Sequence, residues 1–215
     1  MNSNLTEIVC ILDCSGSMAG LEGDTIGGFN AMVEKQKKEP GEALLSAVLF
    51  SDESRVLYDR VDVKKVEPMT DRQYMAGGCT ALLDAIGGAV HHIANVHRYA
   101  REEDRPAKTI FVITTDGMEN ASRRYSCEEV QRMVKHEQEK YGWEFLFLGA
   151  NMDAISAARS FGIRPDRAVR YASDRAGTRL NYSVVGQTIA RFRCEKEISA
   201  DWSAPIEADF QSRGE

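Results

Sequence analysis

The chain has 215 residues, of which 43% are hydrophobic, and a formal net charge of -6 at pH 7. This length allows one complete hydrophobic core, burying on the order of 70% of the unfolded surface. The acidic balance and short basic patches argue against a nucleic-acid partner. No stretch approaches the roughly 20 apolar residues that span a bilayer, and residues 1–4 lack a signal-peptide pattern. We therefore expect a single cytoplasmic domain that binds neither nucleic acid nor membrane.

The five cysteines support the same expectation about location. Their number is odd, and they form neither a C-x-x-C pair nor a dense framework. Such usage is typical of reduced thiols in a reducing compartment.

The first predicted element is a buried strand at residues 8–12, which the sequence Asp-Cys-Ser-Gly-Ser follows directly at residues 13–17. Open α/β sheets bind ligands at the ends of such strands. Carboxylate and hydroxyl oxygens at alternate positions, with a glycine that lets the backbone turn, suit a hard cation such as Mg²⁺ or Mn²⁺. We interpret this segment as half of a metal site.

Strand and helix patterns alternate along the rest of the chain, which indicates a doubly wound, mostly parallel sheet. We expect a helix after the first strand that ends before residue 40, and a core-facing helix over residues 82–96. Gly87 and Gly88 inside the latter predict close packing against the sheet, because each costs about 1 kcal/mol relative to alanine. Further helices are expected from a capping box at Ser126 and Glu129, and from a cap at Asp153. The further strands are predicted at residues 43–50, 55–61, 109–115, 143–149 and 168–172.

Two later segments supply candidates for the other half of the metal site. Thr80 stands at the predicted start of a helix, and Asp116 follows the strand at 109–115 with Gly117 behind it. An alternative is purely structural: the hydroxyls of Ser15, Ser17 and Thr80 would cap helices, and the aspartates would form turn hydrogen bonds.

These residues resemble the metal-ion-dependent adhesion site (MIDAS) of von Willebrand factor type A (vWA) domains. That site has the pattern D-x-S-x-S, then T, then D, and every element is present here in order. The resemblance extends from about residue 5 to about residue 193. It implies a three-layer, Rossmann-like fold with one antiparallel edge strand, at 55–61. The matching site residues are Asp13, Ser15, Ser17, Thr80 and Asp116.

The resemblance also implies a function. The family's cation is usually Mg²⁺, with Mn²⁺ and Ca²⁺ as alternatives here, and an acidic residue of a protein partner completes its coordination. Two aspartates offset the charge of one divalent ion and leave it short of one anionic ligand. We therefore expect a binding module that is not an enzyme. Two alternatives remain: a metal-dependent phosphohydrolase with Asp13 as nucleophile, and a scaffold that binds partners without metal.

Three features outside this pattern lead to further hypotheses. Residues 195–215 form an acidic C-terminal tail, in which Trp202, Ile206 and Phe210 would share one helical face able to dock on this domain or on a partner. A zinc site built from His91, His92 and His97, which lie on one predicted helix, is not favoured, because no spacing matches H-E-x-x-H and at most two of them could face the same way. Oxidation of Cys14 or Cys79, which stand beside predicted ligands, could disturb the metal site.

Overall fold

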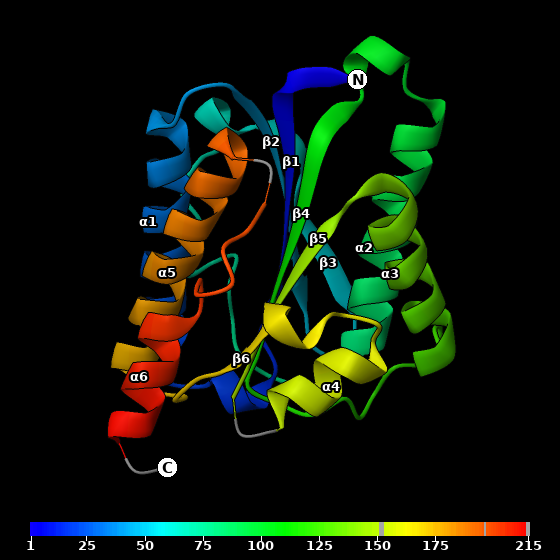
Figure 1. Ribbon diagram of the computed structural model, residues 1–215. Helices are drawn as coiled ribbons and strands as arrows, with labels where there is room; N and C mark the ends of the chain where they lie inside the picture. Colours follow the sequence, from blue (N-terminus) through cyan, green and yellow to red (C-terminus); the bar gives the residue numbers. More distant parts are fainter. Residues whose placement is uncertain (151–152, 196, 214–215) are drawn as a thin grey trace.

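The structure is a computed structural model that describes residues 1–150, 153–195 and 197–213. In this part of the chain, six strands form one sheet in the order β3-β2-β1-β4-β5-β6 (Figure 1). Neighbouring strands are parallel except β2 and β3, which confirms the expected mostly parallel sheet with one antiparallel edge strand. The strands are β1 (Asn2–Asp13), β2 (Glu42–Phe50), β3 (Ser54–Asp62), β4 (Pro106–Thr115), β5 (Glu144–Gly149) and β6 (Ala168–Arg170).

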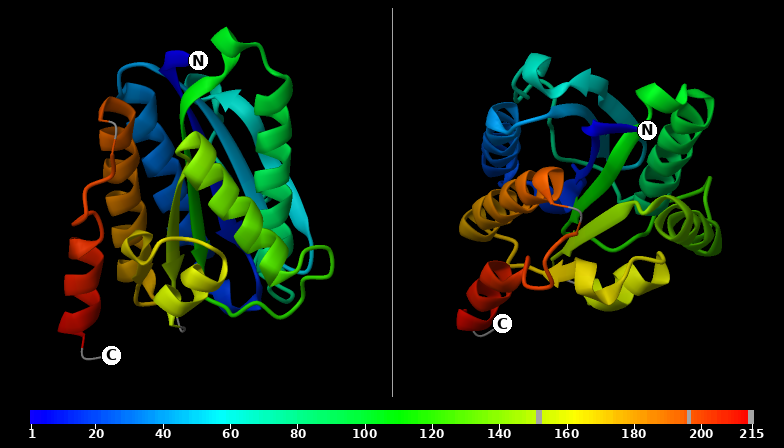
Figure 2. Two further views of the ribbon diagram at one scale, coloured as in Figure 1. Left: turned by 45° about the vertical axis from the view of Figure 1, so that its right-hand side comes forward. Right: turned by 45° about the horizontal axis from the view of Figure 1, so that its top comes forward.

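Helices cover both faces of this sheet and complete three layers (Figures 1 and 2). One face carries α1 (Glu22–Lys38), α5 (Arg175–Cys194) and α6 (Ala204–Ser212). The other carries α2 (Leu82–Tyr99), α3 (Cys127–Tyr141) and α4 (Ala154–Ser160). Short 3-10 turns lie at η1 (Gly16–Met18), η2 (Val63–Lys65), η3 (Glu102–Asp104) and η4 (Pro165–Arg167).

The apolar run of β1 is buried because successive side chains point to opposite faces of a sheet that is covered on both. Ile8, Cys10 and Leu12 belong to the core beneath α1 and α5. Val9 and Ile11 belong to the core beneath α2 and α3. This explains why a strand in the middle of the sheet reads as continuously hydrophobic.

The predicted helix starts at Ser126 and Asp153 are confirmed. The Ser126 Oγ accepts a hydrogen bond from the Glu129 N–H at 3.2 Å, and the Glu129 carboxylate accepts one from the Ser126 N–H at 2.8 Å. Asp153 accepts from the Ser156 N–H at 3.0 Å and begins α4. Both caps satisfy N–H groups that have no partner within the helix.

Two local expectations are wrong. A Cβ on Gly87 would lie 2.5 Å from the ring of Tyr125, in the segment before α3, whereas a Cβ on Gly88 would meet nothing within 4 Å. Gly87 therefore makes room for an aromatic ring, not for the sheet. The last strand is also shorter than predicted: it ends at Arg170, because it pairs with β5 over three residues only.

The acidic C-terminal segment packs on the domain through its apolar residues. Ile198, Trp202 and Ile206 are buried, and the Trp202 Nε1–H donates to the Asp166 carbonyl at 2.9 Å. The ring of Phe210 lies 4.7 Å from the guanidinium of Arg170. Trp202 lies before the start of α6, so the predicted helical face holds only Ile206 and Phe210. Of the two predicted placements, the structure adopts the one on its own domain.

All five cysteines are free thiols. The reducing compartment and the cytoplasmic location stay predictions. Among the described helices, none combines the length and the hydrophobicity needed to cross a bilayer.

Candidate metal centre

The first and third predicted segments meet because β1 and β4 are adjacent parallel strands that end at the same level of the sheet. Leu12 pairs with Thr114 in this register. One residue further along, the Thr115 hydroxyl donates a 2.6 Å hydrogen bond to the Asp13 carboxylate. Strand order reverses between β1 and β4, and such a switch point is where α/β sheets bind ligands.

The loop after β1 connects the two aspartates through its hydroxyls. The Asp13 carboxylate accepts a hydrogen bond from the Ser15 N–H at 2.7 Å. The Ser15 and Ser17 Oγ atoms lie 3.0 Å apart, and the Ser17 hydroxyl donates to the Asp116 carboxylate. A third hydroxyl, that of Ser173 in the loop after β6, lies 3.3 Å from the other Asp116 oxygen. Asp13, Ser15, Ser17 and Asp116 thus form one contiguous set of oxygen atoms.

The loop that carries Thr80 is tied to the loop after β1 by backbone hydrogen bonds. The Gly16 N–H donates to the Gly78 carbonyl at 3.0 Å, and the Gly77 N–H to the Cys14 carbonyl at 2.9 Å. Gly78 has φ +81°, and a Cβ there would collide with the Asp52 carboxylate, so this position requires glycine. The two loops therefore form one unit.

Thr80 completes the cluster at Gly117. A Cβ on Gly117 would lie 2.9 Å from the Thr80 Oγ1 and 3.4 Å from the Ser17 Oγ, so both hydroxyls face the same point. Asn120 fixes the threonine: its Oδ1 accepts from the Thr80 N–H at 2.9 Å, and its N–H donates to the Thr80 carbonyl at 3.1 Å. The structure thus brings all five predicted residues together from three loops.

The structural alternative for the hydroxyls is wrong, although turn hydrogen bonds to Asp13 do form. Ala81 is the N-cap of α2 and makes no side-chain cap bond, and the first-turn N–H groups of Leu83 and Asp84 donate to the side chains of Glu119 and Ser122, not to Thr80. The N-cap of α1 is Leu21, and Ser15, which begins η1, makes no side-chain cap bond. The hydroxyls of Ser15, Ser17 and Thr80 therefore do not cap helices.

Burial of the two aspartates makes their negative charge unfavourable. Asp13 is 1% exposed and Asp116 is 3% exposed, whereas Ser17 is open to solvent. Burial raises the pKa of Asp13 above its usual range, and the neighbouring charge of Asp116 adds to this, while hydrogen bonds from Thr115 and Ser15 oppose it. Among the described residues, no lysine, arginine or histidine forms a salt bridge with Asp13. A cation at this point would offset the charge.

The donor set fits a hard divalent cation. It consists of two carboxylates and three hydroxyls, the ligands of Mg²⁺, Mn²⁺ and Ca²⁺, and contains neither imidazole nor thiolate. The thiol of Cys14 turns away and donates to the Phe50 carbonyl at 3.2 Å. Within the described residues, no group of three or more His, Cys, Asp or Glu side chains could hold a metal.

Sequence reasoning missed Thr115, Asn120 and Ser173. Thr115 had a signal: it precedes Asp116 on a strand parallel to β1, so its hydroxyl is level with Asp13. Asn120 and Ser173 had none, because their contacts depend on the paths of loops that the periodic pattern does not describe.

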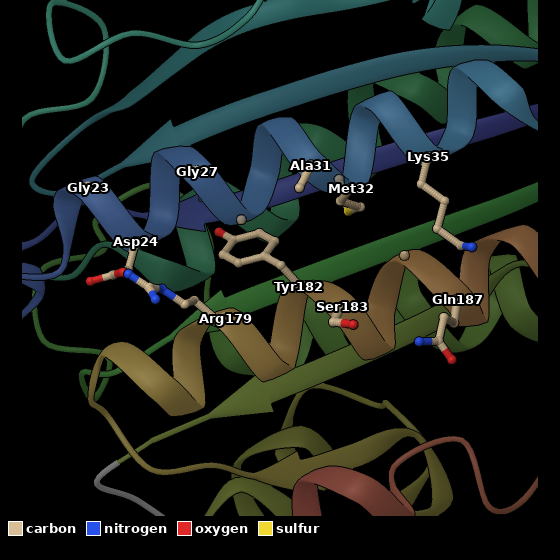
Figure 3. A pocket seen from close by; sticks show the side chains of 12 residues that line it. Gly23, Asp24, Gly27, Ala31, Met32, Lys35, Arg179, Tyr182, Ser183 and Gln187 are labelled. Atoms are coloured by element: carbon tan, nitrogen blue, oxygen red, sulfur yellow. The ribbon is translucent and has the colours of Figure 1, made fainter.

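A groove of about 530 Å³ between α1 and α5 lies apart from this centre (Figure 3). None of the five predicted residues lines it. Gly23 and Gly27 leave the surface of α1 bare there, and at one end Arg179 donates to the Asp24 carboxylate at 2.7 Å.

The fold is that of von Willebrand factor type A domains. The chain is similar to the von Willebrand factor type A protein of Catenulispora acidiphila, at 14% identity and a TM-score of 0.54, covering 85% of this chain and 42% of that one. It is also similar to the vWF domain of the pilus tip protein Mfa5 of Porphyromonas gingivalis, at 11% identity and a TM-score of 0.62, covering 90% and 98%.

A third similar structure is proximal thread matrix protein 1 of the mussel byssus, solved with a zinc-occupied MIDAS motif. It has 17% identity and a TM-score of 0.59, covering 86% of this chain and 46% of that one. The chain thus spans less than half the length of that protein. At these identities the likeness concerns the fold alone. No protein-family model matches the sequence, and no curated protein matches it.

Proposed function

We propose that this chain is a protein-binding module that holds Mg²⁺ at Asp13, Ser15, Ser17, Thr80 and Asp116, and uses it to bind an acidic residue of a partner. Mn²⁺ and Ca²⁺ are the alternative cations. The observation that carries the proposal is the cluster of two buried carboxylates and three hydroxyls, in which Ser17 is exposed and the Thr80 and Ser17 oxygens face one point beside Gly117.

Each residue has a distinct part in this proposal. Asp13 and Asp116 supply negative charge, and the Thr115 hydroxyl and the Ser15 N–H hold the Asp13 carboxylate in place. Ser15, Ser17 and Thr80 turn their oxygens to the cation. Mg²⁺ bound there would present an open coordination position to a carboxylate from outside.

A binding role is favoured over hydrolysis by the same geometry. Water activation on a metal needs a general base placed beside it. The hydroxyls of Ser17, Thr115 and Ser173 contact the aspartates, and a neutral hydroxyl is a weak base. Turnover of p-nitrophenyl phosphate with Mg²⁺, lost in Asp13→Asn, would overturn the proposal in favour of a phosphohydrolase.

The first test is calorimetric titration of Mg²⁺ into the chain, with Gly117→Ala as the variant and Gly88→Ala as its control. The methyl at residue 117 occupies the point that Thr80 and Ser17 face, whereas the one at residue 88 meets nothing within 4 Å. We expect Gly117→Ala to lose Mg²⁺ binding and Gly88→Ala to retain it. Unchanged Mg²⁺ binding in Gly117→Ala would contradict the site.

The second test concerns the partner. Proteins of the source organism's lysate are captured on the immobilised chain with Mg²⁺ and with chelator, using Asp13→Ala as control. A protein retained only by the unmutated chain with Mg²⁺ supports the proposal. Identical retention under all three conditions contradicts metal-dependent binding and supports a metal-independent scaffold.

A further inference from the structure

An apolar groove of about 410 Å³ lies at the same edge of the sheet as the candidate metal centre. Its walls come from the starts of α2 and α3, the segment after β4, and α4, which Figures 1 and 2 show at the carboxyl ends of the strands. The apolar side chains that line it are Leu82, Leu83, Met118, Ala157 and Phe161.

Two residues that line the groove are close in sequence to residues of the metal centre. Leu83 is three residues from Thr80, and Met118 is two residues from Asp116. An extended chain spans at most about 3.6 Å per residue, so these Cα atoms lie within about 11 Å and about 7 Å of the metal-centre residues. A short partner segment can therefore reach both places.

Hydrogen bonds hold the groove and the centre as one surface. The Glu119 carboxylate accepts from the Leu83 N–H at 2.8 Å and from the Ser122 N–H at 2.8 Å. The next residue, Asn120, is the one that fixes Thr80. The wall of the groove and the threonine of the site are thus positioned by neighbouring residues of one segment.

The polar groups at the rim of the groove form hydrogen bonds within the protein. The Glu119 carboxylate is occupied by backbone N–H groups, and Asp153 caps α4 through the Ser156 N–H and hydroxyl. The side chain of Met118 is 70% exposed beside them. The surface left for an occupant is apolar, and a large apolar side chain is the group that gains most by covering it.

We infer that the partner segment which gives its carboxylate to the metal also inserts a large apolar side chain, Leu, Ile, Met or Phe, into this groove. The inference rests on the proposed function and names the chemistry of the partner. The partner's recognition element is an acidic residue with a large apolar residue close to it in sequence. The metal supplies attraction to any carboxylate, and the groove selects among them.

The test is selection of a random displayed peptide library on the full chain with Mg²⁺, followed by affinity measurements on the variant Ala157→Glu. This substitution places a carboxylate in the groove from α4. Ile155→Glu is the matched control, because it adds the same charge to the same helix at a residue that is 47% exposed and does not line the groove.

We expect selected peptides to carry Asp or Glu with a large apolar residue at a fixed offset. Their affinity should fall by about tenfold or more in Ala157→Glu, the equivalent of one buried apolar side chain, and by less than about twofold in Ile155→Glu. Selected peptides that need Mg²⁺ and Asp13 but show no apolar preference would overturn the groove and leave the metal function standing.

The remaining outcomes separate the two proposals. Peptides that bind through the groove but ignore Mg²⁺ and the Asp13→Ala substitution would overturn the metal function and leave an apolar docking site. Failure to select any peptide dependent on either feature would overturn both. Equal affinity of the selected peptides for the unmutated chain and Ala157→Glu would overturn the groove alone.

Discussion

Strand β1 buries two carboxylates, Glu7 near its middle and Asp13 at its end, and the protein treats them differently. Glu7 is fully buried and pairs with two basic side chains, the Arg60 Nε at 2.9 Å and the His97 Nε2 at 3.2 Å. Asp13 is equally inaccessible, yet it accepts hydrogen bonds from a hydroxyl and a backbone N–H and lies near a second carboxylate.

The difference separates a charge that is balanced inside the protein from one that we propose to be functional. A buried charge is costly unless it is paired, and Glu7 receives its counter-charge from within the chain. Asp13 has no salt bridge among the described residues, and in our proposal a cation from outside balances its charge. Glu7 is therefore balanced within the fold, whereas Asp13 is the carboxylate that we propose as a metal ligand.

The largest expected effect tests the charge that is balanced inside the protein. Glu7→Gln leaves Arg60 and His97 without their anion, and we expect the free energy of unfolding to fall by about 3 kcal/mol. Urea denaturation measures it, with Glu42→Gln as an exposed control on β2 that should change little. A loss below about 0.5 kcal/mol in Glu7→Gln would mean that the pairing of Glu7 does not stabilise the fold, and the contrast with Asp13 would be wrong.

The next effect tests the charge that we propose to be functional. At a Mg²⁺ concentration of about 100 times the Kd, the unmutated chain should gain about 2.7 kcal/mol of stability over the chain in chelator. Asp13→Asn should gain nothing from Mg²⁺ and, in chelator, should be no less stable than the unmutated chain. Thermal unfolding with and without Mg²⁺ distinguishes these cases, and an equal gain in both proteins would remove Asp13 from the site.

A third prediction concerns pH. Burial raises the pKa of Asp13 in the folded state, so protons compete with the cation at a higher pH than for an ordinary aspartate. Below that raised pKa, Mg²⁺ affinity should fall by about tenfold per pH unit.

Stability in chelator should respond to pH with the opposite sign. Between the unfolded and the raised folded pKa of Asp13 the folded chain binds more protons, so the contribution of Asp13 to stability increases as the pH falls. Calorimetry and unfolding over the same pH range measure both trends. A Mg²⁺ affinity that does not change with pH would contradict the prediction.

The smallest effect concerns the hydroxyl that supports Asp13. Thr115→Val removes the donor to the Asp13 carboxylate, and we expect a loss of about 1 kcal/mol in stability and a several-fold weaker affinity for Mg²⁺. Thr188→Val is the matched control, because its hydroxyl donates to the Val184 carbonyl inside α5. The control should lose similar stability and no Mg²⁺ affinity. Equal Mg²⁺ affinity in all three proteins would show that Thr115 does not position the ligand.

Much of the fold could be predicted because its local signals agree with one another. The apolar run of β1, the capping box at Ser126 and the cap at Asp153 each depend on residues close in sequence. The packing of Gly87 could not be predicted in the same way. The ring that approaches it belongs to Tyr125, and the pattern of a helix does not identify which distant side chain will fill a bare position.

The sequence by itself determined which polar groups stand at the ends of the predicted elements: a carboxylate at the end of β1, a hydroxyl before α2 and a carboxylate after β4. Each can be recognised from an apolar run and the polar residue beside it. Only the tertiary structure decided that Thr115 holds Asp13, that Asn120 fixes Thr80, and that an apolar groove adjoins the site. Spacing along a strand follows from local geometry, whereas these contacts join loops that are distant in sequence and come together only when the sheet and its helices pack.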